Sequence, residues 1–107
     1  MRKIFISMPI NGKSPDRIND NKLFLLRAAT NHIHEEVELI ESFSDTEQGL
    51  TPIEILGENI KRMNDADYIV FAEGFEEDKE CRTEYDVAMR FWKAILVEHG
   101  NKLKGVS

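Results

Sequence analysis

The segment YIVFAEGFEEDKECRTEYDVA, residues 68–88, decides the fold of this chain. It opens with the apolar run Tyr68–Ala72, whose β-branched and aromatic side chains predict a buried, central strand. The polar loop Phe75–Lys79 follows, and apolar residues then recur at helical spacing from about Glu80 to Lys93. A strand that leads through a polar loop into a helix is the unit in which α/β folds place their functional residues. Glu84, one turn into the expected helix, is therefore the first candidate.

The flanking segments alternate between strand and helix patterns. Charged and apolar residues alternate through Glu36–Glu41, which favours a strand at the edge of a sheet. Thr51-Pro52-Ile53-Glu54 is a capping box with proline at the first helical position. The polar stretch His99–Ser107 is expected to be a frayed tail. We expect strands at Lys3–Met8, Glu36–Glu41, Tyr68–Ala72 and Ala94–Val97, and helices from Pro15 to about Ile33, from Pro52 to about Asp65 and from Glu80 to Lys93.

This alternation predicts an α/β fold with a parallel sheet of about four strands and helices on both of its faces. We expect the strand order 2-1-3-4, which places the topological switch point between the first and third strands. The loops that leave those strands, Pro9–Ser14 and Glu73–Lys79, should then meet across one crevice.

The composition limits the class of protein. At 107 residues the chain is expected to be a single domain spanning residues 1–107. Its net charge of −6 argues against a nucleic-acid polymer as partner, because an acidic surface repels phosphates. The one cysteine, Cys81, suits a reducing compartment, so we expect a cytoplasmic protein. No apolar run approaches the length needed to cross a membrane, and we expect no membrane partner.

Glu84 has two interpretations. A carboxylate near a helix N-terminus is favoured by the helix dipole alone, so it could be a solvated residue of the first turns. Alternatively it points into the crevice as a nucleophile, kept ionised because the helix N-terminus lowers its pKa. Asp78 likewise could cap the helix, or contact the hydroxyls and the leaving base of a ligand.

The other candidates flank the same crevice. Phe75 could stack on a nucleobase or belong to the core. The Asn11-Gly12-Lys13 loop precedes a helix N-terminus, which is a natural anion site, but it could also be an ordinary turn. No His, Cys, Asp or Glu spacing suggests a metal, and no cofactor is expected. The candidates for substrate binding are Ser7, Pro9, Asn11, Gly12, Lys13, Gly74 and Phe75.

Two groups of residues resemble a known family. Ile4-Phe5-Ile6-Ser7-Met8-Pro9 is similar to the opening of the nucleoside 2-deoxyribosyltransferase-like proteins, especially their small, phage-associated members. The second group has an Asp at the start of a strand, a polar residue six positions before a Glu, and an Ala four positions after it. Its residues are Ala66–Phe71, Gly74, Phe75, Asp78, Thr83, Glu84 and Ala88. The resemblance spans nearly the whole chain.

The resemblance implies a three-layer, flavodoxin-like (Rossmann-type) fold. It implies that Glu84 attacks C1′ of a deoxynucleoside or nucleoside 5′-monophosphate, and that Asp78 contacts a substrate hydroxyl or the base. It also implies a homo-oligomer in which a neighbouring subunit completes each pocket. Asp67 lies at the start of its strand, away from the crevice, and is interpreted as structural.

The first hypothesis is therefore an enzyme, without metal or redox cofactor, that cleaves or exchanges an N-glycosidic bond. A second is a non-catalytic nucleotide-binding protein that sequesters or senses its ligand in the same crevice. It is favoured because Phe5 stands where active members often have tyrosine, and Cys81 where they tend to have a second acid. A third is a purely structural interaction domain.

Overall fold

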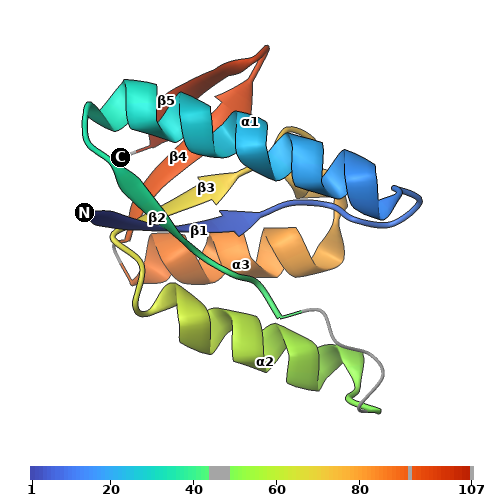
Figure 1. The fold of residues 1–107 in the computed structure, drawn as a ribbon. Coiled ribbons are helices and arrows are strands. Elements are labelled where there is room, and N and C mark those ends of the chain that lie inside the picture. Colours follow the sequence, from blue (N-terminus) through green and yellow to red (C-terminus); the bar gives the residue numbers. More distant parts are fainter. Residues whose placement is uncertain (44–48, 92, 107) are drawn as a thin grey trace.

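The computed structural model describes residues 1–43, 49–91 and 93–106, and its centre is a five-stranded sheet (Figure 1). The order of the strands is β2-β1-β3-β4-β5. All neighbours pair in parallel except β4 and β5, which are antiparallel. The predicted order 2-1-3-4 is confirmed, as are the central place of β3 and the edge position of β2. The strands are β1 (Arg2–Ser7), β2 (Val37–Ile40), β3 (Tyr68–Phe71), β4 (Ala94–His99) and β5 (Lys102–Val106).

Helices cover both faces of the sheet, as the flavodoxin-like three-layer fold requires. Helix α1 (Pro15–Ile33) lies on one face, and α2 (Pro52–Met63) and α3 (Lys79–Arg90) lie on the other (Figure 1). A short 3₁₀ turn, η1 (Phe75–Glu77), connects β3 to α3. In the described part of the chain no helix is both long and apolar enough to cross a membrane.

The helices begin where the sequence places their caps. The Ser14 hydroxyl accepts a hydrogen bond from the Arg17 amide. The capping box of α2 is complete, since the Thr51 hydroxyl accepts from the Glu54 amide and the Glu54 carboxylate accepts from the Thr51 amide. These contacts satisfy amides that have no partner within the helix. They fix the N-terminal ends of the helices beside the carboxyl end of the sheet.

Alternate side chains of β1 face opposite layers, because successive residues of a strand point to opposite sides. Ile4 and Ile6 pack into the core under α1, whereas Phe5 packs into the core under α2 and α3. Ser7, two residues after Phe5, therefore points toward α3. At the other end of the strand, the Asp67 carboxylate accepts from the Lys3 amide at 2.8 Å, which confirms its structural role.

The C-terminal residues correct one prediction. They are not a frayed tail, because β4 continues to His99 and turns back into β5. The turn residues Gly100 and Asn101 have φ values of 58° and 67°, the left-handed geometry that suits a two-residue hairpin. Leu103 of β5 is buried in the core under α1. The sheet consequently has five strands rather than four.

Several predicted boundaries also shift by a few residues, among them the ends of α3 and β4. Helix α3 ends at Arg90 rather than Lys93, and β4 is longer than the expected Ala94–Val97. The sequence also predicts a polar loop from Ser42 to Leu50 and packing of Trp92 on the third helix. Trp92 and residues 44–48 of that loop lie outside the described residues.

Candidate functional site

Glu84 belongs to α3, and its side chain is buried against the end of β1. Its residue is only 4% exposed, and its Oε1 atom accepts a hydrogen bond from the Ser7 hydroxyl at 2.6 Å. The strand alternation aims Ser7 at α3, and the Asp78 cap fixes where α3 begins. The interpretation of Glu84 as a solvated residue is therefore wrong. Ser7 and Glu84 are the two buried polar side chains in the described part of the core.

The protonation of Glu84 differs from the prediction. Burial, together with the negative charges of Asp78 and Glu80, raises the pKa of its carboxyl from 4.5 to about 7. The hydrogen bond from Ser7 acts in the opposite direction. The expected lowering by the helix N-terminus is wrong, because loss of water around a carboxylate outweighs the helix dipole. Glu84 therefore titrates nearer to neutral pH than an exposed glutamate does.

A cavity of about 360 Å³ lies at the carboxyl end of β1, in contact with Glu84. This volume is in the range of pockets that enclose small molecules. The N-terminal parts of all three α-helices contribute to its wall. Among the described residues it is lined by Phe5, Ile6, Ser7, Met8, Ile10, Asn11, Ile18, Lys22, Ser42, Phe43, Pro52, Ile55, Asn59, Asp78, Glu80, Cys81 and Glu84.

The cavity brings together some of the predicted residues and not others. Ser7, Asn11, Asp78 and Glu84 line it, so the loops after β1 and β3 do contribute to one cavity. The remaining candidates are not among its described lining residues, and Gly12 and Gly74 are exposed. These candidates are Pro9, Gly12, Lys13, Gly74 and Phe75.

Phe75 belongs to the core rather than to the cavity wall. It is 5% exposed, and its ring centroid lies 5.2 Å from that of Phe71 and 4.9 Å from that of Tyr85. Phe71 and Tyr85 also meet edge to face, which closes a three-ring cluster between β3 and α3. The proposed stacking of a nucleobase on Phe75 is therefore corrected, because its ring is already covered by protein.

We expect Phe75→Leu to destabilise the fold by about 1 kcal/mol, because it removes aromatic contacts but keeps an apolar side chain. Nucleoside affinity should change less than about twofold. Thermal unfolding and calorimetric titration measure the two quantities on the same sample. A large loss of affinity without a loss of stability would return Phe75 to the binding site.

Asp78 has a structural role at the cavity. Its Oδ1 atom accepts from the Cys81 amide at 3.0 Å, so the predicted N-cap is confirmed. Asp78 is half-buried and lines the cavity. Cys81 is buried, and loss of water raises the pKa of its thiol to about 12. It is therefore a neutral packing residue rather than a nucleophile.

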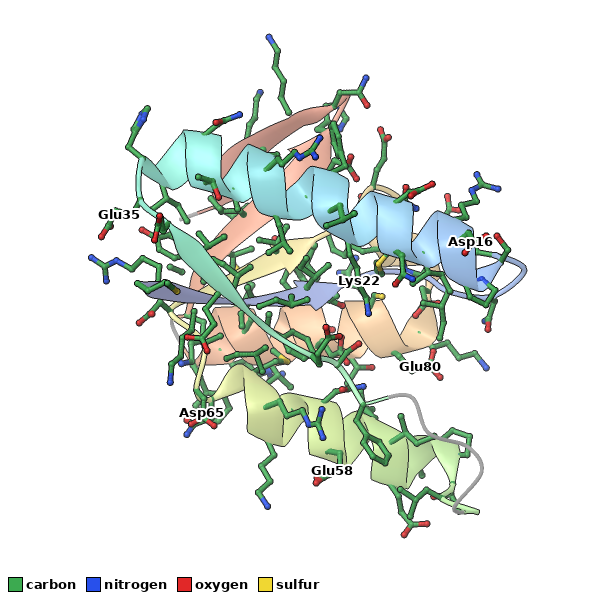
Figure 2. The ribbon with its side chains drawn as sticks, in the orientation of Figure 1. Asp16, Lys22, Glu35, Glu58, Asp65 and Glu80 are labelled. Atoms are coloured by element: carbon green, nitrogen blue, oxygen red, sulfur yellow. The ribbon has the colours of Figure 1, made fainter. Side chains whose placement is uncertain are left out.

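Several lining residues were not predicted. Lys22 reaches the cavity from α1 and Glu80 from the first turn of α3 (Figure 2), and the Lys22 ammonium pairs with Glu41 at 3.3 Å. Phe43 and Asn59 contribute from the loop after β2 and from α2. Asn59 had a signal in the sequence, since it follows Ile55 by four residues on a helix whose other regularly spaced residues are apolar.

The site has no evident metal centre. Within residues 1–43, 49–91 and 93–106, no group of three or more His, Cys, Asp or Glu side chains is placed to hold a metal ion. The cavity is instead acidic, with the carboxylates of Asp78, Glu80 and Glu84 on one side.

Comparison with known proteins supports the fold. A crystal structure described as a conserved protein from Enterococcus faecalis V583 is similar, with a TM-score of 0.64 and 16% sequence identity. The similarity covers 91% of this chain but 62% of the other protein, so this chain spans less than two thirds of that protein's length. No protein-family model and no curated protein matches the chain.

Proposed function

We propose that the protein cleaves or exchanges the N-glycosidic bond of a nucleoside or nucleoside 5′-monophosphate, with Glu84 as the nucleophile. The observation that carries this proposal is the pair formed by Ser7 and Glu84, buried at the wall of a cavity of ligand size. A buried carboxylate with a pKa near neutrality, held by one hydrogen bond beside a cavity, is typical of reactive sites.

The reaction would proceed in two steps. Ionised Glu84 forms an ester bond to C1′ while the bond from C1′ to the base nitrogen breaks, and the base leaves with the bonding electron pair and takes up a proton. Water or a second base then attacks C1′ and releases the Glu84 carboxylate. The Ser7 hydroxyl holds Oε1, which leaves Oε2 free to attack. Active members of the resembled family often have a tyrosine where this chain has Phe5. Ser7 would thus supply the hydroxyl group that such a tyrosine carries and that Phe5 lacks.

Asp78 is the proposed partner of Glu84. Its Oδ1 atom is used by the helix cap, so Oδ2 would accept from a sugar hydroxyl or assist proton transfer to the leaving base. Its charge also raises the pKa of Glu84, which couples the two carboxylates.

We expect kcat/KM to rise with pH and to level off above about 7, since only ionised Glu84 is nucleophilic. Ser7→Ala removes the hydrogen bond that lowers the Glu84 pKa, so its profile should move to higher pH. At pH 7 the variant should be roughly fivefold to tenfold slower. Recovery of most of the activity at pH 9 distinguishes this effect from a general structural defect. A profile identical to that of wild type contradicts the role of Ser7.

The direct test is incubation with a panel of nucleosides and 5′-monophosphates, with free base measured by chromatography. We expect at least one to release its base, and exchange if a second base is added. The proposal is contradicted if the folded protein releases no base from any of them.

A second candidate is a non-catalytic nucleoside- or nucleotide-binding protein. The observation that favours it is the raised pKa of Glu84, because a protonated carboxyl donates a hydrogen bond and is a poor nucleophile. This candidate predicts saturable binding in calorimetry without any release of base.

A further inference from the structure

The wall of the cavity is divided between two kinds of side chain. Three carboxylates and the Ser7 hydroxyl gather at the start of α3 and the end of β1. Much of the remaining wall is apolar and comes from α1, from α2 and from the segments that follow β1 and β2. Its residues are Ile10, Ile18, Phe43, Pro52 and Ile55. A nucleoside has the same division between a hydroxylated sugar and a flat base.

Phe43 provides the accessible aromatic surface of the apolar half. Two aromatic residues line the cavity in the described chain, and Phe5 is only 1% exposed, since it is part of the core. Phe43 is half-buried and lies just after the end of β2, in the segment that the sequence predicts as a polar loop.

The backbone of Phe43 is held at both of its polar atoms. Its amide donates to Asn59 Oδ1 at 2.6 Å, and its carbonyl accepts from Asn59 Nδ2 at 3.0 Å. One side-chain amide of α2 thus replaces the strand partner that this residue lacks beyond the end of β2. This paired contact fixes the position of Phe43 relative to α2.

Arg62, one turn further along α2, also helps to hold Phe43 and the end of β2 in place. Its Nη1 atom donates to the Glu41 carbonyl at 2.7 Å, and its guanidinium lies 5.2 Å from the centroid of the Phe43 ring. This is a cation–π geometry. Arg62 itself is not among the described residues that line the cavity, whereas Phe43 is.

We propose that Phe43 is the platform on which the base of the substrate stacks, and that Asn59 is the residue that positions it. The inference rests on the proposed function, because it assumes a ligand that carries a base. With the base against Phe43, the sugar would lie toward Ser7, Asp78 and Glu84, which line the same cavity. An aromatic ring already fixed before binding costs less conformational entropy when the ligand arrives. Stacking depends on the flat aromatic face that every base has, so a stacking platform can accept more than one base.

The test measures affinity for 2′-deoxyadenosine, thymidine and 5,6-dihydrothymidine, whose base is no longer planar or aromatic. Measurements in the Glu84→Gln background prevent turnover of the ligand. Phe43→Leu should weaken binding of the two aromatic nucleosides roughly fivefold to tenfold, and Phe43→Trp should preserve it. The preference for thymidine over 5,6-dihydrothymidine should disappear in Phe43→Leu. Phe91→Leu is the matched control, because Phe91 is 74% exposed and is not among the described lining residues.

Asn59→Ala tests the positioning role. It should weaken binding by a similar factor, and the double variant with Phe43→Leu should bind no more weakly than Phe43→Leu alone. Additive losses would contradict the role of Asn59, and an unchanged affinity in Phe43→Leu would overturn the platform. Binding that depends on Phe43, together with no release of base by the protein that retains Glu84, contradicts only the proposed function. If neither aromatic nucleoside binds, both proposals fail.

Discussion

Glu84→Gln is expected to lower kcat/KM for base release at least about a thousandfold while the protein stays folded. Glutamine has the size of glutamate, and its oxygen can still accept the hydrogen bond from Ser7. It cannot form the ester to C1′ that the proposed reaction requires. The measurement is release of free base by chromatography, with circular dichroism to verify the fold.

Glu80→Gln is the matched control for this experiment. Glu80 lies one turn before Glu84 on the same helix and lines the same cavity, but it is exposed. Its replacement removes one carboxylate and should change kcat/KM less than about tenfold, mainly through a slightly lower pKa of Glu84. Equal losses in the two variants would show that the cavity needs negative charge rather than a nucleophile.

The parts of this fold that depend on local patterns were predictable from the sequence. The apolar run of β3, the alternation in β2 and the capping box at Thr51 each reflect a preference of a few consecutive residues. The C-terminal hairpin was missed because only Leu103 of β5 is buried. The Gly100-Asn101 pair was the available signal, since two residues of this kind between strand patterns favour a tight hairpin turn.

The candidate site was predictable to a smaller extent, because it depends on contacts between distant segments. Helix position predicts a lowered pKa for Glu84, but the structure buries this residue against β1, which reverses the direction. The same reason explains why Phe75, expected at the crevice, lies in the core, and why Phe43 was not predicted to line the cavity. Phe75 finds two aromatic neighbours in the core, and Phe43 is fixed at the cavity by Asn59, which lies sixteen residues further along the chain. No local pattern contains this information.

The second large effect expected of Glu84→Gln is on stability, and it depends on pH. The pKa of Glu84 is about 7 in the folded protein, against an ordinary value of 4.5 that the unfolded chain should show. Between these two pH values the folded state binds more protons than the unfolded state, so wild-type stability falls as pH rises. Glutamine does not ionise, so the stability of the variant lacks this contribution from residue 84. Its free energy of unfolding relative to wild type should therefore increase by about 2 to 3 kcal/mol between pH 5 and pH 8.

For a domain of this size the change corresponds to a relative gain in Tm on the order of 10 °C. Thermal unfolding of both proteins at pH 5 and pH 8 measures it, and the comparison between pH values cancels any constant effect of the new amide. Glu80→Gln, measured in the same way, is the control, because Glu80 is exposed on the same helix. A difference between Glu84→Gln and wild type that is the same at both pH values would mean that Glu84 ionises like an exposed glutamate.

The two effects of this one substitution separate a functional carboxylate from a structural one. A buried group kept for stability should lower Tm when it is replaced, whereas a group kept for chemistry can be removed with a gain in stability and a loss of activity. We expect Glu84 to behave in the second way above pH 7, since its ionised form is buried, with a hydrogen bond from Ser7 and with Asp78 and Glu80 nearby. A variant that is more stable at pH 8 and inactive toward every nucleoside that wild type cleaves would support the assignment of Glu84 as the nucleophile. A variant that is more stable and still active would show that Glu84 lowers the stability of the fold without taking part in the reaction.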